Sequence, residues 1–251
     1  MVQYGFYFDQ SRCIGCNACS VGCKQWNHLP PGPLKWIRVY QWEKGAFPEM
    51  RVHVLAIPCY HCEKAICVDA CPRGALYKEP KYGAVLIHKE RCTGLRKCWE
   101  ACLYGSISFA SDDRKEIASK CTMCIDRLED GKKPLCVMSC SMRALEFGPI
   151  EELKTKFGNV KNLEDLPSSD LTQPSVIFKP REGKHPLIPW DGQKALHLWK
   201  KRGGGLKANL PDIFEDAGKN LNVSPGMVGR DKLVLKPRNV EELMYYTTDN
   251  D

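Results

Sequence analysis

The sequence of 251 residues lacks any window of about 18 apolar residues, the length that a membrane-crossing helix needs. Its start, MVQYGFYFDQSRC, has neither the apolar stretch of a secretory leader nor a pair of arginines. No basic run is interleaved with aromatics, as a nucleic-acid surface would favour. We therefore expect no membrane span and no nucleic-acid partner. Export, if it occurs, would need a partner that carries the signal.

Cysteine is missing from the C-terminal part of the chain, because the last of the fifteen is Cys140 and the first is Cys13. This confines the cysteine chemistry to the N-terminal part. Disulfides are typical of short secreted chains. Here the cysteines stand in tight C-x-x-C groups, a spacing that favours shared metal over disulfide pairing.

The excess of positive charge has a simple interpretation once metal is considered. The formal net charge of +7 counts every cysteine as neutral, whereas metal-bound cysteines are thiolates. Four cysteine-ligated clusters of roughly −2 each would bring the total near −1. The lysines and arginines therefore balance buried anionic clusters rather than indicate a nucleic-acid partner.

The cysteines fall into four groups with a recognisable spacing. In C-x2-C-x2-C-x3-C, three thiolates bind one cubane and the fourth binds the neighbouring cluster. Two groups make one bacterial ferredoxin module, so four groups predict two modules. Structural zinc is the alternative, and only the last group, C-x2-C-x11-C, is typical of it. The groups are Cys13, Cys16, Cys19 and Cys23; Cys59, Cys62, Cys67 and Cys71; Cys92, Cys98 and Cys102; and Cys121, Cys124, Cys136 and Cys140.

A second repeat follows the last cysteine of three groups. Cys71 precedes PRGAL, Cys102 precedes LYGSI and Cys140 precedes SMRAL, and each unit leads into a short β-prone run. This order of strand, cysteine loop, short helix and strand predicts an α+β fold of two ferredoxin-like modules. After residue 150 a helical stretch and a proline-rich segment follow. We expect this tail to extend across a partner or across the ferredoxin body.

The quoted segments resemble a known family. CIGCNACSVGCKQWN and KCTMCIDRLEDGKKPLCVMSC are similar to the four-cluster iron–sulfur subunits of molybdenum and tungsten oxidoreductases. RALEFGPIEEL and LPSSDLTQPSVIFKP most resemble the electron-transfer subunit in the dimethyl sulfoxide reductase family. The resemblance covers about residues 4–180 and weakens past about residue 183. It implies a molybdopterin catalytic subunit as partner, and often a membrane anchor subunit with a quinone site.

The same resemblance implies nested connectivity. The first module would comprise residues 1–52 and 111–150, the inserted second module residues 53–110, and an extended, partner-wrapping region residues 151–251. The implied ligand sets are Cys13, Cys16, Cys19 and Cys140 for the first cluster; Cys23, Cys121, Cys124 and Cys136 for the second; Cys59, Cys62, Cys67 and Cys102 for the third; and Cys71, Cys92 and Cys98 for the fourth.

The fourth set lacks one ligand, because Leu95 stands where a cysteine is expected. Dimethyl sulfoxide reductase subunits usually have a cysteine there, whereas nitrate reductase subunits have tryptophan and a [3Fe–4S] cluster. Three interpretations are open: a [3Fe–4S] cluster, a decayed and empty site refilled by leucine, and a cubane with a non-protein or borrowed ligand. We favour the first, because three ligand positions persist. The expected cofactors are therefore three [4Fe–4S] clusters and one [3Fe–4S] cluster.

These features predict a non-catalytic electron-transfer subunit rather than an enzyme in its own right. It would relay electrons between a molybdopterin subunit and a quinone-linked anchor, and would be held at the membrane by that partner, on a side that the sequence leaves open. A polyferredoxin-like carrier of a soluble or hydrogenase-type complex is the first alternative. A zinc-binding scaffold is the second.

Overall fold

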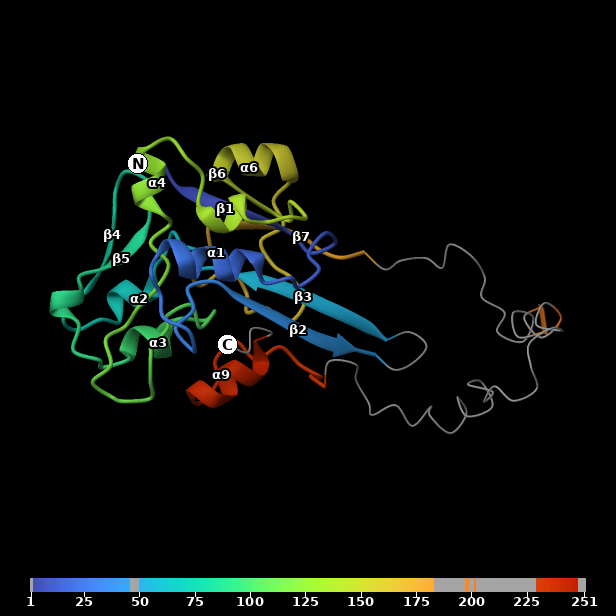
Figure 1. The fold of residues 1–251 in the computed structure, drawn as a ribbon. Helices are drawn as coiled ribbons and strands as arrows, with labels where there is room; N and C mark the ends of the chain where they lie inside the picture. Colours follow the sequence, from blue (N-terminus) through green and yellow to red (C-terminus); the bar gives the residue numbers. More distant parts are fainter. Residues whose placement is uncertain (1, 46–49, 183–196, 199–200, 202–228, 248–251) are drawn as a thin grey trace. The chain divides into compact units, whose positions relative to one another are not determined.

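The computed structural model describes residues 2–45, 50–182, 197–198, 201 and 229–247 (Figure 1). The chain divides into two compact units, one of residues 1–181 with 230–251 and one of residues 182–229. All elements described below belong to the first unit. No helix among the described residues is long and apolar enough to cross a membrane.

A three-stranded sheet joins the two ends of the cysteine-containing region. Its strands, in the order β6-β1-β7, are β6 (Leu145–Pro149), β1 (Tyr4–Asp9) and β7 (Val176–Lys179). β1 runs antiparallel to β6 and parallel to β7. β1 is buried on both faces, which explains its continuous apolar run. Phe6 and Phe8 enter the main core, while Tyr7 stacks on Phe157 at 3.8 Å.

The intervening chain forms two hairpins and several short helices. The longer hairpin pairs β2 (Arg38–Lys44) with β3 (Arg51–Ile57), and the shorter pairs β4 (Leu76–Lys78) with β5 (Val85–Ile87). The helices of this region are α1 (Ala18–Trp26), α2 (Ile66–Asp69), η1 (Lys89–Arg91), α3 (Lys97–Ala101), α4 (Ile125–Glu129) and α5 (Leu135–Met138). This mixture of short helices and strands confirms the α+β class.

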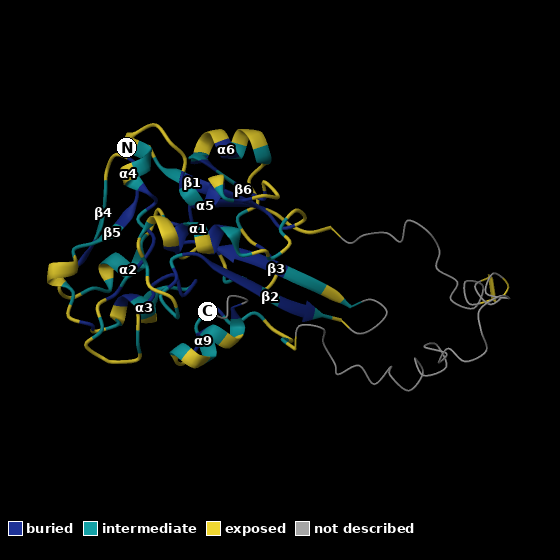
Figure 2. Cartoon of the chain, viewed as in Figure 1, coloured by how far each residue is buried: buried dark blue, intermediate teal, exposed yellow. Residues whose placement is uncertain are grey.

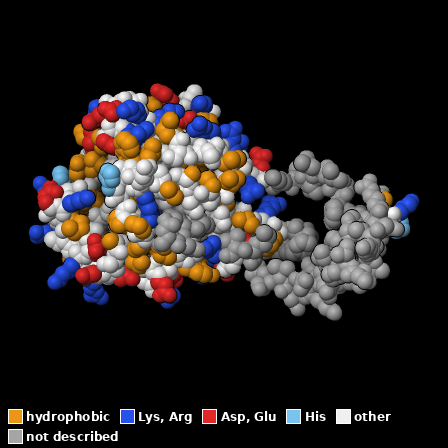
Figure 3. Space-filling model, in the orientation of Figure 1, with side chains coloured by type: hydrophobic (Ala, Val, Ile, Leu, Met, Phe, Trp, Pro, Cys, Tyr) orange, Lys and Arg blue, Asp and Glu red, His pale blue; other side chains and the backbone are white. Residues whose placement is uncertain are grey.

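The buried side chains form two principal cores. The larger includes Phe6, Trp42 and Leu55, and the smaller is built around Leu76 and Phe109. Figure 2 shows the burial concentrated in β1, β2 and β3. On the face seen in Figure 3, basic and acidic side chains are interspersed rather than separated. Each core lies beside cysteines, so the two cores provide two rigid supports for the cysteine loops.

The region after residue 150 contributes regular structure to the first unit. Helix α6 (Ile150–Phe157) covers one face of the sheet, with Ile150 and Leu153 buried against Tyr7. Helix α9 (Val240–Tyr246) ends where Thr247 forms a bridge with Tyr40 of β2. We call residues 230–247 the C-terminal strap. The wrapping of a partner by residues 151–251 stays a prediction, and much of residues 183–228 lies outside the described residues.

The chain leaves and rejoins the first unit beside one cross-strand residue pair of the β2–β3 hairpin. Glu43 and Val52 are directly paired in the register of this hairpin. The guanidinium of Arg181 donates to the Val52 carbonyl at 2.9 Å. The Glu43 amide donates to the Arg230 carbonyl at 2.8 Å. Both ends of the segment between Arg181 and Arg230 are therefore held at a single cross-strand pair.

Candidate iron–sulfur centres

The structure gathers the fifteen cysteines into four places. One cavity is lined by Cys13, Cys16, Cys19 and Cys140, a second by Cys59, Cys62, Cys67 and Cys102, and a third by Cys71, Cys92 and Cys98. The remaining four, Cys23, Cys121, Cys124 and Cys136, lie near enough to one another to raise each other's pKa. We keep the numbering of the sequence analysis. The set with Cys13 is the first, the set with Cys23 the second, the set with Cys59 the third and the set with Cys71 the fourth. All fifteen cysteines are free thiols.

Each cysteine loop begins with the same backbone turn. The residue two positions after the first cysteine of every group has a positive φ: Gly15 at 74°, His61 at 45°, Gly94 at 74° and Met123 at 60°. A left-handed residue at this point reverses the chain sharply, so that following residues turn back toward the same cavity. The four groups are therefore repeats in conformation as well as in sequence.

The loop at Leu95 has kept the geometry of a complete cysteine loop. Gly94 and Arg96, on either side of Leu95, have φ values of 74° and 57°. Gly15 and Asn17, on either side of Cys16, have φ values of 74° and 59°. Leu95 thus occupies the place of Cys16 in an equivalent turn. It lines the cavity of the fourth set and is 54% exposed, so leucine has not refilled the site as a core residue.

A hydrogen-bond donor stands four residues after the last cysteine of every group. The backbone amides of Ala75, Ser106 and Ala144 donate to the sulfurs of Cys71, Cys102 and Cys140 at 3.4, 3.4 and 3.2 Å. In the first group, the side-chain amide of Asn27 donates to the Cys23 sulfur at 3.6 Å. The PRGAL, LYGSI and SMRAL units thus supply N–H groups to sulfur. Such bonds stabilise thiolates and tune the metal that they bind.

Burial makes most of these thiols poor acids while no metal is bound. It raises the pKa of Cys13 and Cys98 to about 11, and that of Cys23 and Cys67 to about 12. At Cys71 burial acts in the same direction, but backbone N–H groups outweigh it and lower the pKa. A bound cationic iron core would favour the thiolates, so cluster assembly at neutral pH must release protons.

Each set of cysteines interacts electrostatically with the next. Cysteines of neighbouring sets lie close enough for one thiolate charge to raise the pKa of the other beyond the effect of burial. These interactions link the first set to the second, the second to the third, and the third to the fourth. The neighbouring pairs are Cys19 with Cys136, Cys59 with Cys121 and Cys98 with Cys67.

The spacing of the thiols suits a group larger than one ion. Among the described residues, no three His, Cys, Asp or Glu side chains converge closely enough to hold a single metal ion. Zinc would require four sulfurs at about 2.3 Å from one centre. The cysteines instead surround shared cavities, with backbone or side-chain N–H groups directed at several sulfurs. This arrangement fits cysteine-ligated iron–sulfur clusters.

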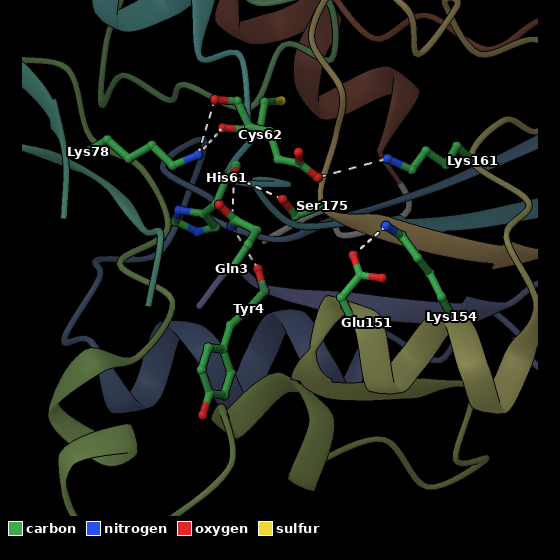
Figure 4. Close-up of polar contacts among 10 residues, drawn as sticks. Gln3, Tyr4, His61, Cys62, Lys78, Glu151, Lys154, Lys161 and Ser175 are labelled. Carbon is green, nitrogen blue, oxygen red and sulfur yellow. Dashed lines mark hydrogen bonds and ion pairs between the residues drawn. The ribbon is translucent and has the colours of Figure 1, made fainter. Parts of the chain in front are cut away.

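The polar surroundings include residues that the motifs did not single out. His61 is fully buried, and its Nδ1 accepts from the Val85 amide at 2.9 Å. Burial holds its pKa well below the usual value, so the ring is neutral. Its carbonyl accepts from Gln3 and Ser175, both at 3.2 Å (Figure 4). These bonds hold His61 as a packed residue of the cysteine loop.

Two cations border the third set. Lys78 donates to the Cys62 carbonyl at 2.9 Å, as Figure 4 shows. Lys120 is 4% exposed and donates to the carbonyls of Cys121 and Val85. Sequence reasoning missed Lys120, although its position directly before Cys121 placed it beside a predicted ligand. By contrast, Lys97 is exposed and paired to Glu100 at 2.7 Å. Arg96 is half-buried and donates to the carbonyls of Ser111 and Asp113.

Comparison with known proteins now defines the class. The sequence pattern of the 4Fe-4S dicluster domain matches residues 50–150, and a second pattern of the same description matches residues 12–76. The chain is therefore an iron–sulfur protein with two ferredoxin-like dicluster domains.

The relatives define the family. The chain is 38% identical over 192 residues to a component of the anaerobic dimethyl sulfoxide reductase of Escherichia coli K12, covering 73% of this chain and 92% of that protein. It is 32% identical over 222 residues to a component of the sulfite dehydrogenase of Allochromatium vinosum, covering 80% and 85%. It is 36% identical over 193 residues to protein NrfC of E. coli K12, covering 74% and 79%. This protein belongs to the family of the dimethyl sulfoxide reductase iron–sulfur subunit, which confirms the resemblance read from its motifs.

Proposed function

We propose that this chain is the electron-transfer subunit of a complex that contains a molybdopterin catalytic subunit. Its relatives are subunits of an anaerobic dimethyl sulfoxide reductase and a sulfite dehydrogenase. The observation that carries the proposal is the close approach of the four cysteine sets, with cysteines of the first and second sets packed in the larger core and those of the third and fourth packed around the smaller one. An arrangement of this kind gives electrons a continuous route through the protein.

The proposed ligands are the four sets in nested connectivity. The first and second sets combine cysteines near residue 20 with cysteines near residue 130, and the pairing of β1 with β6 supports this by joining the same regions. The third and fourth sets are drawn from residues 59–102. We propose [4Fe–4S] clusters in the first three sets. When bound, such clusters supply one-electron redox chemistry, while the chain positions them and donates N–H groups to their ligands.

For the fourth set we propose a [3Fe–4S] cluster. The support is the preserved turn around Leu95 together with the three cysteines that face one cavity. Leucine offers no ligand atom, so one corner of a cubane would lack protein ligation. The fourth cluster would then be the end of the series that exchanges electrons with a quinone-linked anchor subunit, through which the complex would be attached to the membrane.

The decisive experiment is low-temperature EPR with an iron count on the complex purified through this chain. About 15 iron atoms for this subunit and a sharp oxidised signal near g 2.01 are expected from three cubanes and one three-iron cluster. About 12 iron atoms without that signal would show that the fourth site is empty. A co-purifying subunit with bound pterin supports the proposed complex, and its absence from an intact preparation would favour a polyferredoxin-like carrier.

A further inference from the structure

Lys120 is a buried cation with no carboxylate partner among the described residues. Its side chain is 4% exposed, and its ammonium donates to two backbone carbonyls, those of Val85 and Cys121, the latter at 3.0 Å. Transferring a charged ammonium out of water is strongly unfavourable unless an opposite charge compensates it. Two carbonyl dipoles provide partial compensation only. The protein must therefore hold another negative charge close to Lys120.

The position of Lys120 shows where that negative charge lies. Cys121, the next residue, belongs to the second set, while Val85 lines the cavity of the third set. The positive charge of Lys120 acts to lower the pKa of Cys121 and also of Cys67, one from each set. Lys120 thus stands between two groups of cysteine ligands. Clusters bound there would be anionic and would supply the missing counter-charge.

We propose that Lys120 is a fixed positive charge that raises the reduction potentials of both the second and the third cluster. These two clusters are the central ones in the proposed order of electron transfer. The inference rests on the proposed function, because it requires clusters in both sets. Each reduction adds a negative charge, and a nearby cation stabilises the more negative state. A unit charge about 10 Å away at an effective dielectric constant of about 20 changes such an equilibrium roughly tenfold.

The contrast with Lys97 sharpens the prediction. Lys97 is directly before Cys98 of the fourth set, as Lys120 is directly before Cys121. Its side chain, however, is 59% exposed and paired with Glu100. Water and the carboxylate screen its charge, so its effect on the neighbouring cluster must be much smaller. Lys97 therefore serves as a matched control for a lysine that precedes a cluster ligand.

The test is an EPR-monitored redox titration of the intact complex, carried out for the wild type and for Lys120→Gln, Lys120→Arg and Lys97→Gln. Glutamine keeps N–H donors for the two carbonyls but removes the charge. We expect Lys120→Gln to lower both central potentials, so that the reduced-to-oxidised ratio falls roughly tenfold at the wild-type midpoint, or about 59 mV for one electron. The outer potentials should stay unchanged. Lys120→Arg and Lys97→Gln should remain near the wild type.

Three results would overturn the proposal. The first is a Lys120→Gln complex with all its iron and wild-type central potentials, and the second is an equal shift of all four potentials. The third is loss of a central cluster from Lys120→Gln but not from Lys120→Arg, which would assign the lysine to assembly instead. The wild-type titration separates this test from the proposed function, because a wild type without signals from clusters in both central sets would refute that function before any variant is compared.

Discussion

The side-chain amide of Asn27 donates a hydrogen bond to the sulfur of Cys23 at 3.6 Å. In the other three groups a backbone amide occupies the corresponding position, four residues after the last cysteine. In the first group the N–H donor to the last cysteine sulfur therefore comes from a side chain, whereas in the other groups it comes from the backbone. Because a side chain can be replaced without changing the backbone, Asn27 offers the cleanest access to this shared feature.

Replacing Asn27 by alanine should lower the reduction potential of the second cluster. A hydrogen bond to a ligand sulfur stabilises the more negative, reduced state, and its loss removes that stabilisation. The potential is measured by EPR-monitored titration of the complex. Gln25→Ala, in the same helix and exposed, is the control and should leave all potentials unchanged. A second-cluster potential equal in Asn27→Ala and wild type would show that the contact does not tune the site.

Replacing Leu95 by cysteine should convert the fourth site to a cubane. The turn that holds Leu95 matches the turn that holds Cys16, so the new sulfur would face the cavity of the fourth set. We expect the iron count of the subunit to rise from about 15 to about 16 and the signal near g 2.01 to disappear. Leu95→Ala is the control and should keep the wild-type spectrum. An unchanged spectrum and iron count in the cysteine variant would contradict the proposal that the fourth set holds a [3Fe–4S] cluster because Leu95 supplies no ligand.

Replacing Gly105 by alanine should loosen the C-terminal strap. Gly105 has φ of 58°, and a Cβ there would collide with the Leu235 carbonyl of the strap. The left-handed conformation alone costs roughly 1–2 kcal/mol for alanine, and the collision adds to it. We expect trypsin to cleave the strap several-fold faster. Gly131→Ala shares the positive φ, at 70°, but has no atom within 4 Å of the added carbon. Equal cleavage in both variants would contradict the prediction.

Deleting residues 183–228 and joining the ends by a short glycine–serine linker should leave the clusters intact. The flanking residues Arg181 and Arg230 are anchored to Val52 and Glu43, which face each other across the hairpin. The linker must span this pair, about 5 Å, together with one hydrogen bond on the Glu43 side and the length of the Arg181 side chain on the other, a distance that about ten glycine–serine residues reach. The iron content and EPR spectrum should match those of the wild type. Loss of iron would show that the deleted segment supports the cluster-binding body.

The sequence carried much of the information about the cysteine sites, because local spacing determines the loops. Two of the four left-handed positions are glycines, Gly15 and Gly94, the residue type that adopts this conformation readily. His61 and Met123 adopt the same conformation without that signal. Their backbone is held by the surrounding fold, which no short motif reveals. The assignment of individual cysteines to sets depends on contacts across more than a hundred residues, so spacing alone left it to the family resemblance.

Elements formed by long-range contacts were harder to predict. β7 pairs in parallel with β1, a partner about 170 residues away, and nothing local in its short apolar run indicates that partner. Helix α9 did have a local signal, since the Asn239 side chain accepts from the Glu242 amide at 2.8 Å in an N-cap. Lys120 could be located beside a ligand, but its burial between two sets required the three-dimensional fold.

The backbone of the first unit is interrupted at one place only between β7 and the C-terminal strap, where Arg181 and Arg230 are held by the paired residues Val52 and Glu43. A segment whose two ends are held at one cross-strand pair can change in length without changing the pairing of the strands on either side. Descendants of such a gene could lengthen, shorten or exchange the segment between Arg181 and Arg230 while the cysteine sets stay the same. A reporter domain grafted between these two arginines would travel with the subunit and would mark its place in a larger assembly.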